Sequence, residues 1–282
     1  MKKLLSLLML TAACAFAQTN SAPATEAAPN ATAPKAAPAA AVEPSARKAR
    51  QLLDQMIAAL GGDAWLSYKT FSQQGRSYTF FHGKPTSAGT IYWRFSEYPD
   101  KERRELTKQR DVIYIYNSGK GYEKTYKGTA AEEDKSMQEM LRSQRHRLDL
   151  VIREWLKDPK TVLFYDGQSV ADQQLVDVVT ILNKDNDQVS IGIDINSHLP
   201  INKRFTWRDA DKYKVEDETI YGNYRKVQGM ETPYTVTNKR DGEIIGQNFL
   251  THAAYNETYA PGFFDASVTY NPETYNPKAK KP

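Results

Sequence analysis

The side chains that usually carry catalysis or bind metal ions are few and far apart in this sequence. The four histidines are His82, His146, His198 and His252, and no pair of them has the four-residue helical spacing of a zinc-protease motif. The only cysteine, Cys14, lies close to the N-terminus, and the sequence contains neither a Cys/His cluster for structural zinc nor a Gly-x-Ser-x-Gly motif. We therefore predict a protein that is not an enzyme and that uses no metal and no cofactor.

The acidic turn and two of the histidines have simple structural interpretations. Residues Asp185, Asn186 and Asp187 form a short acidic turn that lacks the glycine and the distal glutamate of a calcium loop, so we interpret it as a hairpin turn. His198 precedes a Leu-Pro pair and is expected in a turn. His146 is expected as a solvated residue of an arginine-rich helix. None of these features predicts a metal site.

The apolar side chains are more informative. The chain has 17 Tyr, 10 Phe and 4 Trp, and many of them fall on predicted strands, where they either pack into a core or line a cavity. Met137 and Met140 lie on the apolar stripe of a predicted helix, and such flexible, polarizable side chains can repack against varied ligands. An ordinary packed core is the alternative for each residue. The candidate cavity and lid residues are Trp93, Phe95, Tyr114, Met137, Met140, Leu141 and Leu148.

Two helices are expected to help position these residues. The first follows the capping sequence Pro44-Ser45, presents an apolar face between Ala49 and Leu60, and ends at Gly61-Gly62. The second is long and extends from about Ala130 to Leu156, with an apolar stripe flanked by arginines. The sequence Lys157-Asp158-Pro159 ends it, because proline does not continue a helix.

The remainder of the folded region has the pattern of strands. Between Ser67 and Glu123, and again after Pro159, short runs rich in β-branched and aromatic residues alternate with turn sequences. In the run 188–195 apolar and polar residues alternate strictly, which is typical of a half-buried antiparallel strand with one solvated face. Further strands are expected at Leu175–Leu182, Ile201–Trp207, Val215–Tyr221, Tyr234–Asn238 and Ile244–Leu250.

The order of these elements predicts the fold class. Short strands at close spacing favour antiparallel pairing, because parallel strands require helical crossovers between them. We predict an α+β fold with a single large, curved antiparallel sheet that forms an unclosed half-barrel. The N-terminal helix and the inserted long helix are expected against its concave side.

The N-terminus has the pattern of a secretory signal peptide over residues 1–17. Lys2 and Lys3 precede an apolar stretch, and Ala15-Phe16-Ala17 supplies a small-x-small cleavage site. Cleavage after Ala17 predicts an exported, periplasmic protein. The alternative is a membrane-tethered lipoprotein modified at Cys14, but Thr11 stands where a lipobox normally has an aliphatic residue.

Composition divides the rest of the chain. Residues 18–45 contain 11 Ala and 5 Pro, and this segment has too little large apolar surface to offset the entropy of ordering, so it is predicted to be a disordered spacer. Residues 46–265 form one predicted domain, and residues 266–282 a disordered tail. The net charge of +4 is concentrated in the leader and the tail. The near-neutral body therefore does not favour nucleic acid as a partner.

The order of elements and several motifs resemble a known family. The motifs are Ala59-Leu60-Gly61-Gly62, Asp194-x-x-x-His198-Leu199-Pro200-Ile201, Tyr224-Arg225-Lys226-Val227-Gln228-Gly229-Met230-x-x-Pro233, Ala254-Tyr255-Asn256 and Phe263-Phe264-Asp265. Over residues 46–265 the chain resembles the outer-membrane lipoprotein-sorting and lipoprotein-carrier-like (LolA/LolB-like) proteins of bacterial envelopes. The resemblance implies a half-barrel whose helices cover a hydrophobic cavity that holds acyl chains.

Three functional interpretations follow from these observations. The leading one is a periplasmic binding or carrier protein whose partners are lipid or lipoprotein acyl chains. The second is a non-enzymatic interaction module of the envelope, which has a filled core and acts on other envelope proteins through its surface or its spacer. The third is a hydrolase whose carboxylates and histidines come from separate strands, because only the fold brings such residues together.

Overall fold

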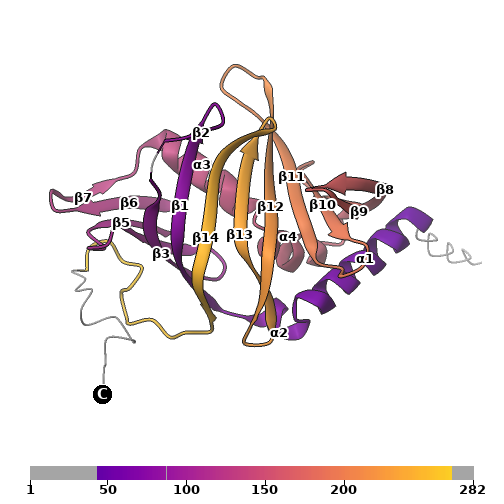
Figure 1. Ribbon diagram of the computed structural model, residues 1–282, viewed down its shortest axis with the longest axis horizontal. Coiled ribbons are helices and arrows are strands. Elements are labelled where there is room, and N and C mark those ends of the chain that lie inside the picture. Colours follow the sequence, from indigo (N-terminus) through magenta and orange to yellow (C-terminus); the bar gives the residue numbers. More distant parts are fainter. Residues whose placement is uncertain (1–42, 87, 269–282) are drawn as a thin grey trace, which may run out of the picture. The chain divides into compact units, whose positions relative to one another are not determined.

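The protein is one large antiparallel sheet with helices on one side of it (Figure 1). The computed structural model describes residues 43–86 and 88–268. The predicted signal peptide with Cys14, most of the spacer 18–45 and most of the tail 266–282 lie outside these residues. The strands are β1 (Thr70–Phe81), β2 (Lys84–Pro85), β3 (Thr90–Glu97), β4 (Lys101–Leu106), β5 (Val112–Asn117), β6 (Lys120–Thr125), β7 (Gly128–Ala131), β8 (Val162–Ala171), β9 (Gln174–Leu182), β10 (Gln188–Asp194), β11 (Pro200–Arg208), β12 (Lys214–Val227), β13 (Met230–Arg240) and β14 (Glu243–Tyr255).

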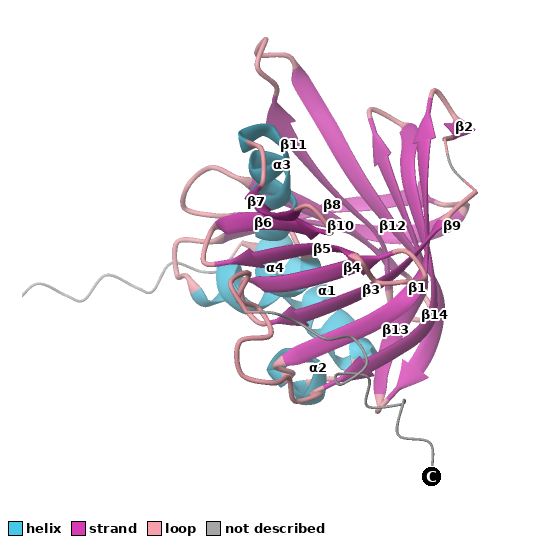
Figure 2. Cartoon of the chain, turned by 90° about the vertical axis from the view of Figure 1, so that its left-hand side faces the viewer, coloured by secondary structure: helices cyan, strands magenta, loops and turns pink. Residues whose placement is uncertain are grey.

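The strand order makes two arms that meet at the centre of the sheet. The order is β7-β6-β5-β4-β3-β1-β14-β13-β12-β11-β10-β9-β8, with β2 paired to β1. One arm (β3–β7) leads outward from β1 as a meander, and the other (β8–β12) leads back from the opposite edge toward β14. Because β7 and β8 form the two edges, the sheet is curved but not closed, and the predicted half-barrel is confirmed (Figure 2).

The helices lie in the concavity between the two arms (Figure 2). They are α1 (Pro44–Leu60), α2 (Asp63–Ser67), α3 (Asp134–Arg145) and α4 (Leu148–Glu154), and a 3-10 turn, η1 (Trp155–Lys157), follows α4. The apolar face of α1 and that of α4 pack onto β9, β10 and β11 and form the main core. Its fully buried members include Leu53, Met56, Val151, Val179, Ile181, Val189, Ile191 and Ile193.

The second helix differs from the prediction, because it is two helices. Ala130 belongs to β7, and α3 and α4 are separated at His146 and Arg147. Arg147 has extended backbone angles (φ −60°, ψ 140°), and its guanidinium bonds the carboxylate of Asp149 in the first turn of α4. The Arg147–Asp149 ion pair and the buried ring of His146 stabilise a turn between the two helices. The apolar stripe alone predicted one continuous helix.

The start of α1 also differs from the prediction. The helix begins at Pro44, which occupies a first-turn position that needs no N–H donor, so Ser45 is inside the helix and is not its cap. The Ser45 hydroxyl instead accepts a hydrogen bond from the backbone N–H of Tyr165 on β8, at 2.9 Å. The predicted C-terminal end at Gly61-Gly62 is confirmed, and Gly61 has a positive φ of 130°.

The strand predicted at 188–195 is confirmed as β10, but its second face is only partly solvated, because Gly192 and Asp194 are buried. Val189, Ile191 and Ile193 face the main core, as expected. On the opposite face the side chain of Asn202 lies so close to Gly192 that an added Cβ would come within 2.3 Å of it. The Ser190 hydroxyl bonds that of Thr180 at 2.7 Å. Side chains of the neighbouring strands β9 and β11 therefore cover part of the convex face of β10.

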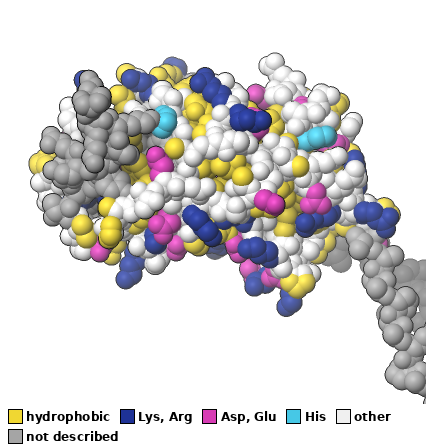
Figure 3. Space-filling model, turned by 90° about the horizontal axis from the view of Figure 1, so that it is seen from below, with side chains coloured by type: hydrophobic (Ala, Val, Ile, Leu, Met, Phe, Trp, Pro, Cys, Tyr) yellow, Lys and Arg dark blue, Asp and Glu magenta, His cyan; other side chains and the backbone are white. Residues whose placement is uncertain are grey.

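One face of the molecule does not separate charge by sign. On the face shown in Figure 3, basic and acidic side chains are interspersed. Within the described residues, none of the helices combines the length and the apolar character needed to span a bilayer.

The main core predicts a sharp contrast between two leucine substitutions. Leu53→Ala removes a side chain that is 0% exposed, and we expect it to lower the free energy of unfolding by about 2–5 kcal/mol. Leu175→Ala removes a side chain that is 43% exposed, and we expect a change within about 0.5 kcal/mol. Urea unfolding followed by circular dichroism measures both, and equal losses would contradict this assignment of the core.

Candidate functional site

Helix α3 crosses the concave side and touches both arms of the sheet. On the β3–β7 arm, Met137 lies directly over Gly121, since a Cβ added to that glycine would come within 2.7 Å of the methionine sulfur. One turn further along α3, the sulfur of Met140 lies 3.4 Å from the guanidinium of Arg104 on β4. Two flexible thioether side chains thus contact this arm, and Gln144 near the end of α3 donates to the carbonyl of Asp100 at 2.8 Å.

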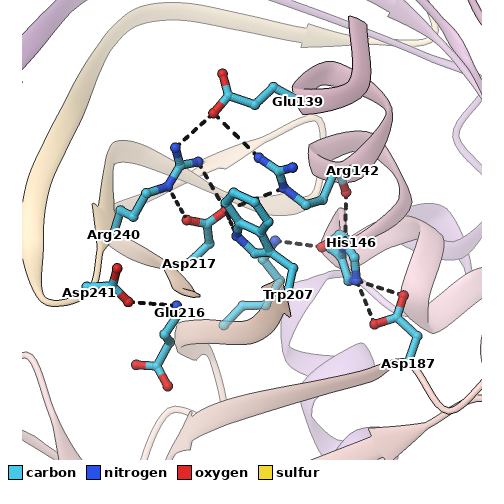
Figure 4. A network of polar contacts seen from close by, with 10 residues as sticks. Glu139, Arg142, His146, Asp187, Trp207, Glu216, Asp217, Arg240 and Asp241 are labelled. Carbon is cyan, nitrogen blue, oxygen red and sulfur yellow. Dashed lines mark hydrogen bonds and ion pairs between the residues drawn. The ribbon is translucent and has the colours of Figure 1, made fainter. Parts of the chain in front are cut away.

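On the opposite arm α3 is held by charge and by an aromatic ring (Figure 4). The Arg142 guanidinium stacks 3.5 Å from the ring centroid of Trp207 on β11. The carboxylate of Asp217 accepts from the Trp207 indole N–H at 3.0 Å and from Arg240 at 2.7 Å. Arg240 also bonds Glu139 on α3, at 2.8 Å. These contacts clamp the helix to β11, β12 and β13.

His146, at the end of α3, is buried and completes the clamp. Its ring is 4% exposed and lies parallel to that of Phe205, with 3.9 Å between centroids. Nδ1 bonds the carbonyl of Arg142 at 2.7 Å, and Nε2 bonds the carboxylate of Asp187 (Figure 4). The prediction of a solvated His146 is therefore wrong, because the break after α3 directs the ring into the sheet. The acidic turn at 183–187 is a hairpin turn, as predicted.

The concave face of the central strands is not covered as tightly as the main core. Ser77, Asn248, Val236 and Tyr221 are neighbours across β1, β14, β13 and β12, so their side chains share one face. Tyr221 is four residues along β12 from Asp217, which contacts α3, so this is the α3 side of the sheet. All four are only half-buried. We call them the central row.

A buried charged cluster lies on the same side of the β3–β7 arm. The carboxylate of Glu102 on β4 is 0% exposed and bonds the guanidinium groups of both Arg94 and Arg104. Burial alone would raise the pKa of Glu102, but these two arginines outweigh it and lower that pKa to about 2. Arg94 and Arg104 remain about one third exposed, at 32% and 39%.

A second ion pair follows where α4 begins. Asp149 accepts two hydrogen bonds from Arg147, at 3.0 and 2.6 Å, and one from the Tyr68 hydroxyl at 3.0 Å. Burial would raise the pKa of Asp149, but Arg147 holds it below its usual range. Burial raises the pKa of Tyr68, so its hydroxyl remains a donor to this carboxylate.

Lys203 on β11 is a buried cation without a carboxylate bonded to it among the described residues. Its ammonium donates to the carbonyl of His146 at 2.6 Å and lies 5.3 Å from the Phe205 ring centroid. Burial lowers the pKa of Lys203 to about 8.

Neither Lys203 nor the Glu102 cluster was a sequence candidate. The only available signal was the dense run of charges of both signs in Lys101–Glu105, which by itself resembles a solvated segment.

Two of the predicted cavity residues lie on the opposite face of the sheet. Phe95 packs edge-on against Phe263 of the C-terminal segment, at 5.1 Å between centroids. Trp93 lies under the guanidinium of Arg110, 5.0 Å away. These rings cover the convex side of β3, next to the buried ion pair of Arg103 with Glu105.

The other five predicted residues are on the helix side but do not form one lining. Tyr114 donates from its hydroxyl to Glu123 on β6, at 3.0 Å. Met137 and Met140 contact the β3–β7 arm, as described above. Leu141 borders a small groove of about 320 Å³ between α3 and β11, and Leu148 packs against the main core.

A larger groove lies at the edge of the sheet, away from α3. It has a volume of about 960 Å³ and runs between the outer flank of α1 and the start of β8, with Arg47, Gln51, Ala58, Val162 and Leu163 among its lining residues. Within the described ranges, no group of three or more His, Cys, Asp and Glu side chains is arranged to hold a metal ion.

Comparison with known proteins supports the fold and leaves the activity open. No family model matches the sequence, and no curated protein matches it. Among solved structures, a DUF1329 family protein from Desulfovibrio piger aligns with a TM-score of 0.54 at 9% identity, covering 77% of this chain and 97% of its own. The resemblance predicted from the sequence is confirmed as a resemblance of fold.

Two further solved structures are similar at lower TM-scores. A domain named as an outer-membrane lipoprotein-sorting protein, from Vibrio parahaemolyticus, has a TM-score of 0.48 at 9% identity and covers 78% of this chain and 97% of its own. A LolA superfamily protein from Nitrosomonas europaea has a TM-score of 0.45 at 9% identity, covering 76% and 95%. At such identities the similarity concerns the fold alone.

The Glu102 cluster predicts a specific dependence of stability on pH. Because the folded pKa of about 2 is below the ordinary 4.5, the cluster stabilises the protein fully above pH 4.5 and loses this contribution as pH falls toward 2. Between pH 6 and pH 3 we expect wild type to lose about 2 kcal/mol more of its unfolding free energy than Glu102→Gln does.

Urea unfolding at the two pH values measures this difference. Glu243→Gln is the matched control, because that side chain is 62% exposed, and its stability is expected to follow the wild-type dependence on pH. Parallel losses in wild type and Glu102→Gln would refute the role of the buried carboxylate.

Proposed function

We propose that the protein is an envelope binding or carrier protein that holds the acyl chain of a lipid or lipoprotein on the concave face of its central strands, beside α3. The observation that carries this proposal is the half-buried central row. In the other half of the concavity α1 and α4 fill the space with fully buried side chains. The side chains of the central row, by contrast, keep partial contact with solvent.

The row and its surroundings suit an amphiphile. Val236 and Tyr221 offer apolar surface, and Tyr92 on β3, which is 7% exposed, continues the same face toward the β3–β7 arm. Burying a chain contributes about 0.8 kcal/mol per CH₂ group, so ten carbons contribute on the order of 8 kcal/mol before the cost of association. No cofactor is required for such binding.

The attachment of α3 supports its role as a movable cover. Its contacts with the β11–β13 strands are ion pairs, one cation–π contact and the buried His146, whereas Met137 and Met140 face the other arm. Thioether contacts are less directional than ion pairs, so we expect the Met137 end of α3 to move when a chain enters. The exported, periplasmic location with cleavage after Ala17 belongs to the same proposal.

A second function is favoured by a different observation. The groove of about 960 Å³ lies along an edge strand and the flank of α1, outside the concavity, and the main core beneath α1 is filled. An interaction module of the envelope would use such an outer surface and leave the central row without a ligand.

A pair of tryptophan substitutions on β13 separates these functions. Val236→Trp places a large ring on the central row, and we expect it to weaken binding of a fluorescent fatty acid at least about tenfold. Thr235→Trp is the control, because Thr235 is its neighbour on the opposite face of the same strand, and we expect wild-type affinity. Fluorescence titration measures both, with circular dichroism to check folding.

The result that overturns the proposal is equally clear. If wild type does not bind the fatty acid, or if Val236→Trp binds as wild type does, the central row is not the acyl site. Mass spectrometry of lipids extracted from protein purified from native envelopes provides the independent measurement.

A further inference from the structure

We propose that Arg94 and Arg104 form a binding site for an oxyanion, a carboxylate or phosphate group, which is the head group of the bound amphiphile. The inference rests on the proposed acyl-binding function for the source of the oxyanion. The site itself is built from the charges, register and hydrogen bonds of β3 and β4.

The register places two cations directly opposite each other. Arg94 on β3 and Arg104 on β4 are cross-strand partners, so both side chains project from one face, and like charges in such positions repel. The contact of Arg104 with Met140 identifies this face as the α3 side. A single carboxylate, that of Glu102, bonds both guanidinium groups. The two guanidinium groups thus share one hydrogen-bonded carboxylate.

Charged groups of both signs surround this pair, and the carboxylate of Glu132 acts electrostatically on Arg104. Arg147, on the α3–α4 connection, acts electrostatically on Glu102, but its own bidentate partner is Asp149. Arg153 on α4 donates to the carbonyl of Tyr68 and lies over the rings of Tyr68 and Tyr98. Lys203 bonds a carbonyl. Each of these three cations thus has a hydrogen-bond partner other than Glu102.

Unused hydrogen-bond donors lie within the same cluster. The Nε of Arg94 and one terminal nitrogen of Arg147 are buried and find no acceptor among the described residues. Buried donors without an acceptor are costly, and guanidinium groups bind carboxylate and phosphate oxygens in charge-assisted pairs. At about one third exposure, Arg94 and Arg104 remain accessible to a ligand.

The position relative to the central row fits an amphiphile of ordinary length. Thr90 on β3 pairs with Ser77, a member of the row, and Arg94 is four residues further along β3 on the same face. With about 3.3 Å per residue along β3 and about 4.8 Å across one strand spacing, Ser77 lies about 14 Å from Arg94, which a chain of about twelve carbons can span. Tyr92 lies between them. A head group at Arg94 therefore places its chain toward Val236.

The test compares three probes by calorimetric titration: dodecyl phosphate, dodecanol and inorganic phosphate. We expect dodecyl phosphate to bind at least about tenfold more tightly than dodecanol in wild type. Arg94→Gln and Arg104→Gln should each reduce this preference about tenfold, because each removes charge-assisted bonds but leaves Glu102 paired with the other arginine. Glu102→Gln should increase the preference, since it removes the competing carboxylate.

The matched control is Arg76→Gln, an arginine of β1 that bonds the carbonyl of Gly89 away from this cluster, and we expect the wild-type preference. A merely structural cluster would lower stability in Glu102→Gln without raising the preference for phosphate. Thermal melts of every variant confirm folding under the titration conditions.

The outcomes for the head group and for the chain are distinguishable. If both amphiphiles bind equally, and the arginine variants leave this unchanged, the oxyanion site is wrong and the acyl site stands. If no amphiphile binds but inorganic phosphate does, and Arg94→Gln abolishes that binding, the site takes a free oxyanion and the acyl proposal fails. If none of the three probes binds, both proposals fail.

Discussion

The structure depends on how one strongly curved sheet covers its concave face. A sheet that curves but does not close presents a wide inner surface, and in this protein side chains from the helices α1 and α4 fill one half of it. Leu53 and Met56 from α1 and Val151 from α4 meet Ile191 of β10 in a fully buried core. The other half is crossed by α3, which contacts both arms, and the central strands beside it keep a half-buried inner face.

Several buried charged groups lie on the concave side of the sheet. The buried carboxylates Glu102 and Asp149 are each bonded by arginine, which keeps them ionised, while additional cations such as Lys203 use carbonyl oxygens or aromatic rings. A buried charge is costly unless it is paired. Arg94 and Arg104 share the single bonded carboxylate of Glu102, and the proposed head-group site follows from the same pairing that stabilises the fold.

The parts of the fold that were predictable are those with a local cause. The apolar face and glycine end of α1, the strict alternation of β10 and the turn sequences around Asn117 and Asp241 each specify structure within a few residues. The break at Arg147 escaped prediction because the ring of His146 and the carboxylate of Asp149 act across space as well as along the chain. Trp93 and Phe95 were assigned to a cavity because composition cannot distinguish the two faces of a strand.

The amino-acid sequence by itself determined the class of protein, an antiparallel sheet with an amphipathic first helix. It also predicted a secretory signal peptide, and it contains no motif typical of catalysis. Only the tertiary structure decided which side of each strand faces α3, and that Glu102, Arg94 and Arg104 are neighbours in the concavity. The physical reason is that periodicity is a property of consecutive residues, whereas the face that becomes buried depends on register and on what the rest of the chain packs against it.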